Sequence, residues 1–299
     1  MEIWIYFTLL AATMQAVRTA GQKQLSGKLN AMATTGVRYV YALPFAWGYL
    51  WWLLEFTEVS VPSLTNSFLL YALIACVMQI WGTACLVAAF RYRNFAVATS
   101  LAKTEAIQVA IVGALVFGAS LSGLGWFSVI VGVLGVFLVS KVKFNFRDML
   151  ADSQGLIGMS YGLAAGLGLA VTTLLIRESS LALHTDLMVS AAVTLVFMIT
   201  VQSLISLAYI YLQDKSQLIL MVKYWRLCLF VGITSVLGSI GWFTGASYQN
   251  AAYVKALGQV EFFITLALTY RVFKEKITAK EYLGMFLIVL SVIILLLWA

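Results

Sequence analysis

The segment Tyr92-Arg93-Asn94-Phe95-Ala96 leads through Leu101 to Glu105, and it recurs later as Tyr248-Gln249-Asn250-Ala251-Ala252, which leads through Leu257 to Glu261. The two asparagines and the two glutamates are both 156 residues apart, and the same offset pairs Gly82 with Gly238. A long repeat at one constant spacing is typical of a duplicated chain. The sequence therefore predicts two copies of one unit, each with a glutamate inside an apolar segment.

Composition places the chain in a membrane. Of its 299 residues 62% are hydrophobic, 10% are charged and only two are prolines, and a helix needs about 20 apolar residues to cross about 30 Å of hydrocarbon. Ten apolar stretches approach that length, and the connectors between them are too short for a further domain. They run approximately over residues 4–23, 34–54, 68–90, 96–117, 124–140, 155–176, 187–211, 227–248, 251–272 and 282–298.

We therefore expect an all-α membrane protein with ten transmembrane helices, arranged as two five-helix repeats over residues 1–148 and 149–299. Five is an odd number, so the second repeat enters the membrane from the opposite side and the repeat is inverted. Transporters built this way bind substrate near the bilayer midplane, between the halves. Each glutamate lies eleven residues beyond its asparagine, or about 16 Å along a helix, which is close to half the thickness of the hydrocarbon layer.

The basic residues indicate the orientation. Of the 19 Lys and Arg residues, 14 fall in loops that follow odd-numbered spans, and only Arg177 falls in a loop that follows an even-numbered one. Because cytoplasmic loops are rich in Lys and Arg, we expect both termini on the non-cytoplasmic side of the inner (cytoplasmic) membrane. The spread of these residues over short loops does not favour nucleic-acid binding.

Two interpretations of Glu105 and Glu261 stay open. A carboxylate at the bilayer centre costs about 2.5–3.5 kcal/mol on insertion scales, so a proton or substrate site would explain why two lie there. Alternatively, each glutamate is neutral or paired and fastens neighbouring helices. Lys103 lies two residues before Glu105, on another helix face, while Lys255 and Gln259 are one turn apart on a shared face. We expect one polar side of each helix to line a cavity and the other to pack inside its own half.

Other polar side chains in the spans extend this candidate site. Gln15 and Arg18 share a face of the first span, Arg38 begins the second and Gln79 interrupts the third, while Trp242 is suited to stacking on a ring or bounding an apolar pocket. Arg18 would otherwise snorkel from the end of its helix. Since the cations outnumber the two glutamates, a substrate with a carboxylate fits better than a pure cation.

These features resemble the drug/metabolite transporter superfamily, in its ten-helix EamA-type branch. The resemblance covers the whole chain and is carried by the duplicated unit, by Arg38-Tyr39, by the small residues after Tyr92 and Tyr248, and by the turn Phe273-Lys274-Glu275-Lys276-Ile277-Thr278. It implies export of small metabolites or drugs through a central cavity. The first copy of the turn, Gly118-Ala119-Ser120-Leu121-Ser122, lacks the charged residues of the second, and many members of the family have cytoplasmic termini.

The sequence therefore predicts a secondary active transporter that exports a small polar or amphipathic metabolite, such as an amino acid or related carboxylate, by alternating access and with protons as the coupling ion. Efflux of lipophilic cations and an uncoupled channel are the alternatives. An enzyme is not expected, because Gly158-Met159-Ser160-Tyr161-Gly162 lies mid-helix and His184 has no second histidine. We expect no cofactor or metal, a small-molecule substrate in a lipid bilayer, no nucleic acid, and a monomer or weak homodimer.

Overall fold

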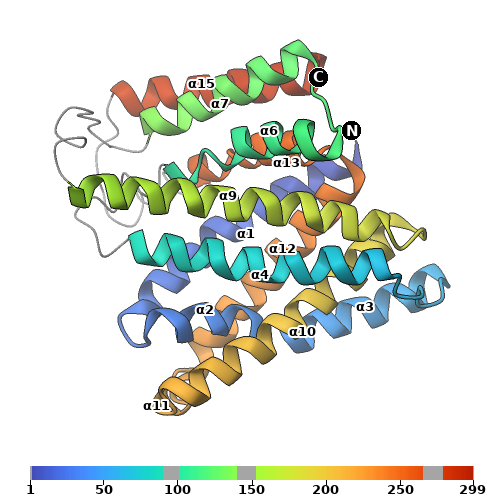
Figure 1. Ribbon diagram of the computed structural model, residues 1–299, viewed down its shortest axis with the longest axis vertical. Helices are drawn as coiled ribbons and strands as arrows, with labels where there is room; N and C mark the ends of the chain where they lie inside the picture. The colour runs from blue at the N-terminus through green and yellow to red at the C-terminus, as the bar shows by residue number, and fades with distance from the viewer. Residues whose placement is uncertain (1, 90–100, 140–152, 265–278, 299) are drawn as a thin grey trace. The chain divides into compact units, whose positions relative to one another are not determined.

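The computed structural model describes residues 2–89, 101–139, 153–264 and 279–298, and contains no β-strand within them. Apolar sequences in a chain with only two prolines make long helices, as Figure 1 shows. They are α1 (Ile3–Ser26), α2 (Ala31–Val40), α3 (Leu43–Thr57), α4 (Asn66–Ala89), α6 (Glu105–Phe117), α7 (Gly123–Val139), α9 (Ser153–Leu181), α10 (Leu187–Gln213), α11 (Ser216–Lys223), α12 (Trp225–Tyr248), α13 (Ala251–Gly258) and α15 (Ala279–Trp298).

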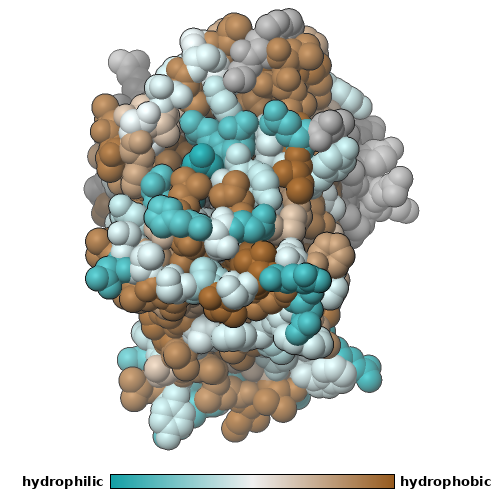
Figure 2. All heavy atoms as spheres, turned by 90° about the vertical axis from the view of Figure 1, so that its right-hand side faces the viewer, coloured by the Kyte–Doolittle hydropathy of each residue, from teal (hydrophilic) through white to brown (hydrophobic). Residues whose placement is uncertain are grey.

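Four of these helices are long and apolar enough to cross a membrane, over residues 66–86, 156–181, 187–213 and 225–248. Three more, over residues 105–117, 123–138 and 282–297, are apolar but shorter. Large hydrophobic side chains such as Leu115, Trp51 and Phe286 are exposed, and Figure 2 shows hydrophobic side chains beside hydrophilic ones on the face in view. The number of ten spans stays a prediction, because parts of the fourth, ninth and other predicted spans lie outside the described residues.

The second predicted span differs from the expectation. It forms two helices, α2 and α3, separated by Tyr41 and Ala42, because Pro44 stands in the first turn of α3, where its missing N–H and fixed φ are tolerated. The predicted connector between residues 213 and 226 also contains a helix, α11. Its start is fixed by Asp214, whose carboxylate accepts hydrogen bonds from the backbone N–H and hydroxyl of Ser216.

Arg177 lies in α9 rather than in a loop, because this helix continues to Leu181. Its guanidinium Nη1 donates to the carbonyl oxygens of Ala246 and Ser247 at 2.7 and 3.2 Å. These carbonyls belong to the last turn of α12, which carries a partial negative charge. The single basic residue assigned to the loops after even-numbered spans is therefore a helix cap, and the orientation of the termini stays a prediction.

The helices form two compact units that cut across the sequence repeats. Unit 1 comprises residues 1–76 and 175–248, and unit 2 comprises residues 77–174 and 249–299. Both units therefore combine helices from the two halves of the sequence. The predicted repeat boundary at residues 148 and 149 lies outside the described residues.

In unit 1, α1 packs along α12. A Cβ added to Gly238 would meet Met14 Cβ at 3.4 Å and backbone atoms of Ala11 and Gln15 at 3.8 Å. Nearer one end, Gly21 lies against Phe230. Small residues thus let the two backbones approach, as in other close-packed membrane helices.

Unit 2 contains the equivalent contact between α4 and α9. A Cβ on Gly82, the counterpart of Gly238, would lie 3.2 Å from both the carbonyl oxygen of Ala165 and the N of Leu169. Ala165 and Leu169, which Gly82 faces, lie 154 residues after Ala11 and Gln15, which Gly238 faces. The two glycines therefore contact equivalent positions of α9 and α1. In each crossing the two helices come from opposite halves of the sequence.

The helices α7 and α15 of unit 2 lie side by side (Figure 1), and they also come from opposite halves of the sequence. Ser128 Oγ donates to the carbonyl of Ser291 at 2.9 Å, and Ser291 Oγ donates back to the carbonyl of Ser128 at 2.8 Å. Further along, a Cβ on Gly135 would lie 2.7 Å from the carbonyl oxygen of Gly284. At the 156-residue offset Ser128 is the counterpart of Gly284, and Gly135 is the counterpart of Ser291. The Ser128–Ser291 contact and the Gly135–Gly284 contact are therefore equivalent under the repeat. The two helices run antiparallel, as the fifth helices of inverted halves would.

Candidate functional site

Both glutamates stand directly after a break in a helix of unit 2. Leu101 and Ala102 are helical, Lys103 and Thr104 form a turn, and α6 starts at Glu105. In the second copy α13 ends at Gly258, Gln259 and Val260 form a turn, and helix resumes at Glu261. The two turns are 156 residues apart and bonded alike, with N–H of Thr104 and of Val260 donating three residues back at 3.0 and 3.1 Å. The repeat therefore includes the break as well as the glutamate.

The breaks explain the order of the charges along each helix. Glu105 lies in the first turn of α6, where free N–H groups make the helix end partially positive. Lys255 lies in the last turn of α13, where free carbonyls make the end partially negative. Lys255 before the second break and Glu105 after the first therefore match the polarity of their helix ends.

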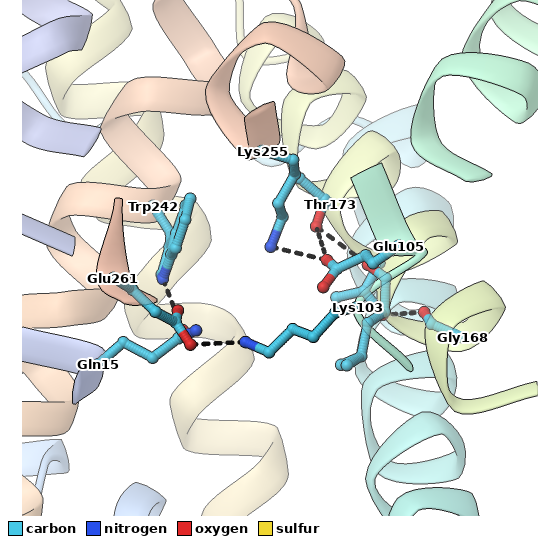
Figure 3. A network of polar contacts seen from close by, with 10 residues as sticks. Gln15, Lys103, Glu105, Gly168, Thr173, Trp242, Lys255 and Glu261 are labelled. Carbon is cyan, nitrogen blue, oxygen red and sulfur yellow. Dashed lines mark hydrogen bonds and ion pairs between the residues drawn. The ribbon is translucent and has the colours of Figure 1, made fainter. Parts of the chain in front are cut away.

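Glu105 is held by two partners from other helices. Lys255 Nζ lies 2.7 Å from Glu105 Oε1, and the two side chains are 16% and 15% exposed. The single hydroxyl proton of Thr173 in α9 is shared between the same oxygen, at 3.4 Å, and the carbonyl of Leu169, at 3.0 Å. Figure 3 shows the three side chains converging. This carboxylate is thus ion-paired and hydrogen-bonded in a largely desolvated position.

Glu261 is held by the other lysine. Lys103 Nζ lies 2.5 Å from Glu261 Oε1, with side-chain exposures of 36% and 13%. The ammonium also stands 5.4 Å from the centre of the Phe262 ring, within the range of a cation–π contact. Lys103 is therefore the more accessible of the two lysines, although its glutamate is as buried as the other.

Both ion pairs join opposite halves of the sequence. Lys103 from the first half binds Glu261 from the second, and Lys255 from the second half binds Glu105 from the first. The expectation that one polar side would pack inside its own half is wrong for these residues, since each helix offers both its cation and its carboxylate to the other. Packing of α6 against α13 brings the four charges together.

Gln259 directly follows α13 and has different neighbours from Lys255, with which it was expected to share a face. The Gln259 side chain is 7% exposed and lies against Gly132 of α7, close to Ser291. Neither polar atom of its carboxamide has a hydrogen-bond partner within the described part of the chain. Gln259 thus occupies the repeat position of Lys103 without taking part in an ion pair.

Four of the other predicted site residues, Gln15, Arg18, Arg38 and Trp242, belong to unit 1, and Gln79 belongs to unit 2. In unit 1, Trp242 Nε1 donates to Gln15 Oε1 at 2.9 Å, linking α12 to α1. Arg18 is buried in α1, and the Arg38 guanidinium lies 5.5 Å from the centre of the Tyr39 ring. Gln79 is half-buried in α4 of unit 2, where its backbone carbonyl accepts from Thr83 at 2.8 Å.

Sequence reasoning missed Thr173 and Phe262 as neighbours of the charges. Thr173 carries no motif, and only its place in an apolar helix, near Thr172, marks it as a polar side chain that needs a partner. Ser160 of the G-x-S-x-G pattern donates to the carbonyl of Leu156 one turn earlier, as helical serines commonly do. Within the described ranges no three His, Cys, Asp or Glu side chains are grouped as metal ligands.

Comparisons with known proteins agree with this architecture. The model of the EamA-like transporter family matches residues 2–141 and again residues 156–297, which confirms the duplication and the family resemblance. A solved structure described as "Crystal structure of protein" superposes with a TM-score of 0.75 over 99% of this chain and 97% of its own, at 12% sequence identity. That likeness concerns the fold alone. No curated protein matches the chain.

Proposed function

Because the chain belongs to the EamA-like transporter family and is thus a multi-pass membrane transporter, we propose that it exports small carboxylate-bearing or amphipathic metabolites, such as amino acids. The coupling ion in this proposal is the proton, and transport proceeds by alternating access. We place the protein in the inner membrane with its termini on the non-cytoplasmic side, as the loop charges favour.

The observation that carries the proposal is the pair of crossed Lys–Glu contacts at the two helix breaks. A zwitterionic substrate carries the same two charges that each ion pair contains. Its carboxylate competes with a glutamate for a lysine, and its ammonium competes with that lysine for the glutamate. Substrate therefore exchanges for an internal ion pair without leaving a charge unpaired in the membrane.

Proton coupling follows from the same exchange. When Lys103 binds a substrate carboxylate, Glu261 loses its closest recorded cation and accepts either the substrate ammonium or a proton. Substrate and proton thus compete for one carboxylate, which is the requirement for antiport. The matched breaks, before α6 and after α13, provide places where the backbone changes direction between states.

Transport into proteoliposomes tests the proposal. With a pH gradient imposed, a panel of radiolabelled amino acids and other carboxylates should include a substrate whose flux rises with the gradient. Lys103→Gln should raise its KM about 10–150-fold, the worth of about 1.5–3 kcal/mol for a charge-assisted contact. Glu261→Gln should transport with a flattened pH profile. Matched reconstitution efficiency, checked by size-exclusion chromatography, controls for misfolding.

Three results would overturn the proposal. Folded Glu105→Gln and Glu261→Gln proteins with unaltered rates and pH profiles would make the glutamates structural. Flux that ignores the pH gradient would indicate an uncoupled facilitator. Cationic dyes that bind better after Lys103→Gln would indicate efflux of lipophilic cations, since removing a competing lysine strengthens their attraction to the glutamates.

A further inference from the structure

Four exposed basic residues gather at one end of unit 1, where none of them belongs to the candidate transport site. Lys28 stands in the turn between α1 and α2, Lys215 and Lys223 begin and end the α11 segment, and Arg226 lies in the first turn of α12. Within the described residues none of the four forms an ion pair. This group, the α11 basic patch, therefore has no ion-paired carboxylate in the part of the chain that the structure describes.

An aromatic ring lies close to each of these cations. Lys28 and Lys223 both lie over the Tyr224 ring, at 4.6 and 5.7 Å from its centre, and Lys215 lies 4.2 Å from the centre of the Tyr211 ring. Arg226 stands 5.5 Å from the Trp225 ring. A ring face attracts the charge but does not satisfy the N–H donors. The donors stay available for the oxygens of an anionic ligand.

The segment α11 is fixed in place by its inward-facing polar groups. Buried Gln217 accepts a hydrogen bond from the backbone N–H of Asn30 at 2.9 Å and donates to Asp214 at 3.0 Å. Tyr41 donates to the carbonyl of Met221 at 2.9 Å. The basic patch is therefore mounted on a rigid element rather than on a free loop.

Asp214 is the acidic residue beside Lys215, but its oxygens are already occupied. Oδ1 accepts from the N–H and hydroxyl of Ser216, and Oδ2 accepts from Gln217. These bonds hold the pKa of Asp214 below its usual value. The carboxylate is thus bonded to the first turn of α11, and it forms no ion pair with any of the four cations.

The surroundings of the patch identify that partner. Leu212, Ile219 and Val222 are 79%, 72% and 70% exposed beside the cations, and Tyr211 and Trp225 are also exposed. A nucleic acid or a small dissolved anion would leave these apolar side chains in water. An anionic phospholipid satisfies both sets, because its phosphate meets the cations while its acyl chains cover the apolar residues.

We propose that the α11 basic patch binds the headgroups of anionic phospholipids in the leaflet that borders α11. The two loops that build it, after the first and seventh spans, are both among those that the charge distribution assigns to the cytoplasmic side. Their contact through Asn30 and Gln217 places them together, as that assignment requires.

Native mass spectrometry of the purified full chain tests the site. Nanodiscs of phosphatidylcholine containing phosphatidylglycerol should release protein that retains phosphatidylglycerol preferentially. The triple variant Lys28→Gln/Lys215→Gln/Lys223→Gln should lose at least fivefold of this preference, since each cation near an anionic surface contributes roughly that factor. Lys280→Gln, an exposed lysine in α15 of unit 2, is the matched control and should leave the preference unchanged.

Other results would refute the site. Equal phosphatidylglycerol retention by the wild type and by the folded triple variant would show that the patch is not the binding surface. An equal loss in Lys280→Gln would show a non-specific charge effect. Displacement of the lipid by inorganic phosphate at millimolar concentration would show a small-anion site, in which Leu212, Ile219 and Val222 play no part.

Discussion

The two helix breaks of unit 2 carry equivalent glutamates but differ in the lysines that bind them. Lys255 lies four residues before the repeat position that Lys103 occupies, and Gln259 stands at that position instead. The carboxylates are equally buried, yet Lys255 is 16% exposed and Lys103 is 36% exposed. Glu105 also receives a hydrogen bond from Thr173.

This comparison shows which part of a duplicated site is constrained. The backbone breaks and the carboxylates keep their spacing in the two copies. The lysine that binds the carboxylate does not, because Lys255 lies one helical turn before the position equivalent to Lys103. A long lysine side chain makes this possible, because its flexible stem spans about one helical turn. The result is one more enclosed pair, Lys255–Glu105, and one more accessible pair, Lys103–Glu261. We expect substrate to exchange first with the accessible pair.

The largest expected effect is a difference in protein stability between the variants Glu105→Gln and Glu261→Gln. Glu105→Gln leaves the enclosed Lys255 without its carboxylate and should lower the free energy of unfolding by about 3 kcal/mol, as for other broken buried pairs. Glu261→Gln leaves Lys103 closer to solvent and should lower it by about half as much. Thermal unfolding in detergent measures both. Adding Lys255→Met to Glu105→Gln should restore most of the loss, and a larger loss for Glu261→Gln would reverse our ranking of the pairs.

The glycine crossings extend the comparison to α4 and α12. Gly82→Ala brings a Cβ to within 3.2 Å of the α9 backbone, which does not yield easily, so we expect a loss of about 1–3 kcal/mol. Gly238→Ala meets its nearest atom at 3.4 Å, an ordinary contact, and should be neutral or slightly stabilising. Unfolding midpoints of the two variants decide the point. Equal losses would mean that the crossings tolerate side chains alike.

Thr173 tests the additional partner of Glu105. Thr173→Val removes the donor and should cost about 0.5–1.5 kcal/mol of stability. Thr172→Val is the matched control, because Thr172 donates only to the carbonyl of Gly168 among the recorded contacts, at 2.7 Å. In the Glu105→Gln background the difference between the two threonine variants should shrink. A difference that persists there would show that Thr173 acts independently of Glu105.

Asp214 is the exposed reference carboxylate, with the smallest expected effect. Hydrogen bonds from Ser216 and Gln217 lower its pKa in the folded protein. A lowered folded pKa adds stability above the unfolded value of about 3.9, and this stability is lost as the pH falls through the folded value. Asp214→Asn should therefore be slightly less stable at pH 7 and lose less between pH 5 and pH 3. Unchanged acid sensitivity would exclude this contribution.

Much of the fold was accessible from the sequence because the membrane imposes long apolar runs. The 156-residue offset identified Gly82 and Gly238 as equivalent, and the structure places both at helix crossings. The division between α2 and α3 was not predicted, because the apolar run continues through Pro44. The sequence did not predict that α9 continues past Arg177, because a charged residue normally ends an apolar run. Here the arginine stays helical and caps α12.

The arrangement of the site was less accessible. Helical periodicity placed Lys255 and Gln259 on one face, but it did not show that Lys255 binds Glu105 while Gln259 lies against Gly132. Nothing in Leu101–Glu105 resembles a helix breaker, so the first break depends on tertiary contacts. Pairing of Lys103 with Glu261 likewise depends on the packing of α6 against α13, which no local pattern encodes. The roles of Gln15, Arg18, Arg38, Gln79 and Trp242 in transport stay predictions.

The glycine crossings make the two sequence repeats structurally dependent on each other. Gly82 of the first repeat rests on α9 of the second, and Gly238 of the second rests on α1 of the first. This is the relation of subunits in a domain-swapped dimer, in which each polypeptide completes the core of its partner. A gene cut between Val139 and Ser153 would thus encode two fragments that are unstable singly and assemble when expressed together. The duplicated chain is, in that sense, a dimer whose subunits have been joined by a linker.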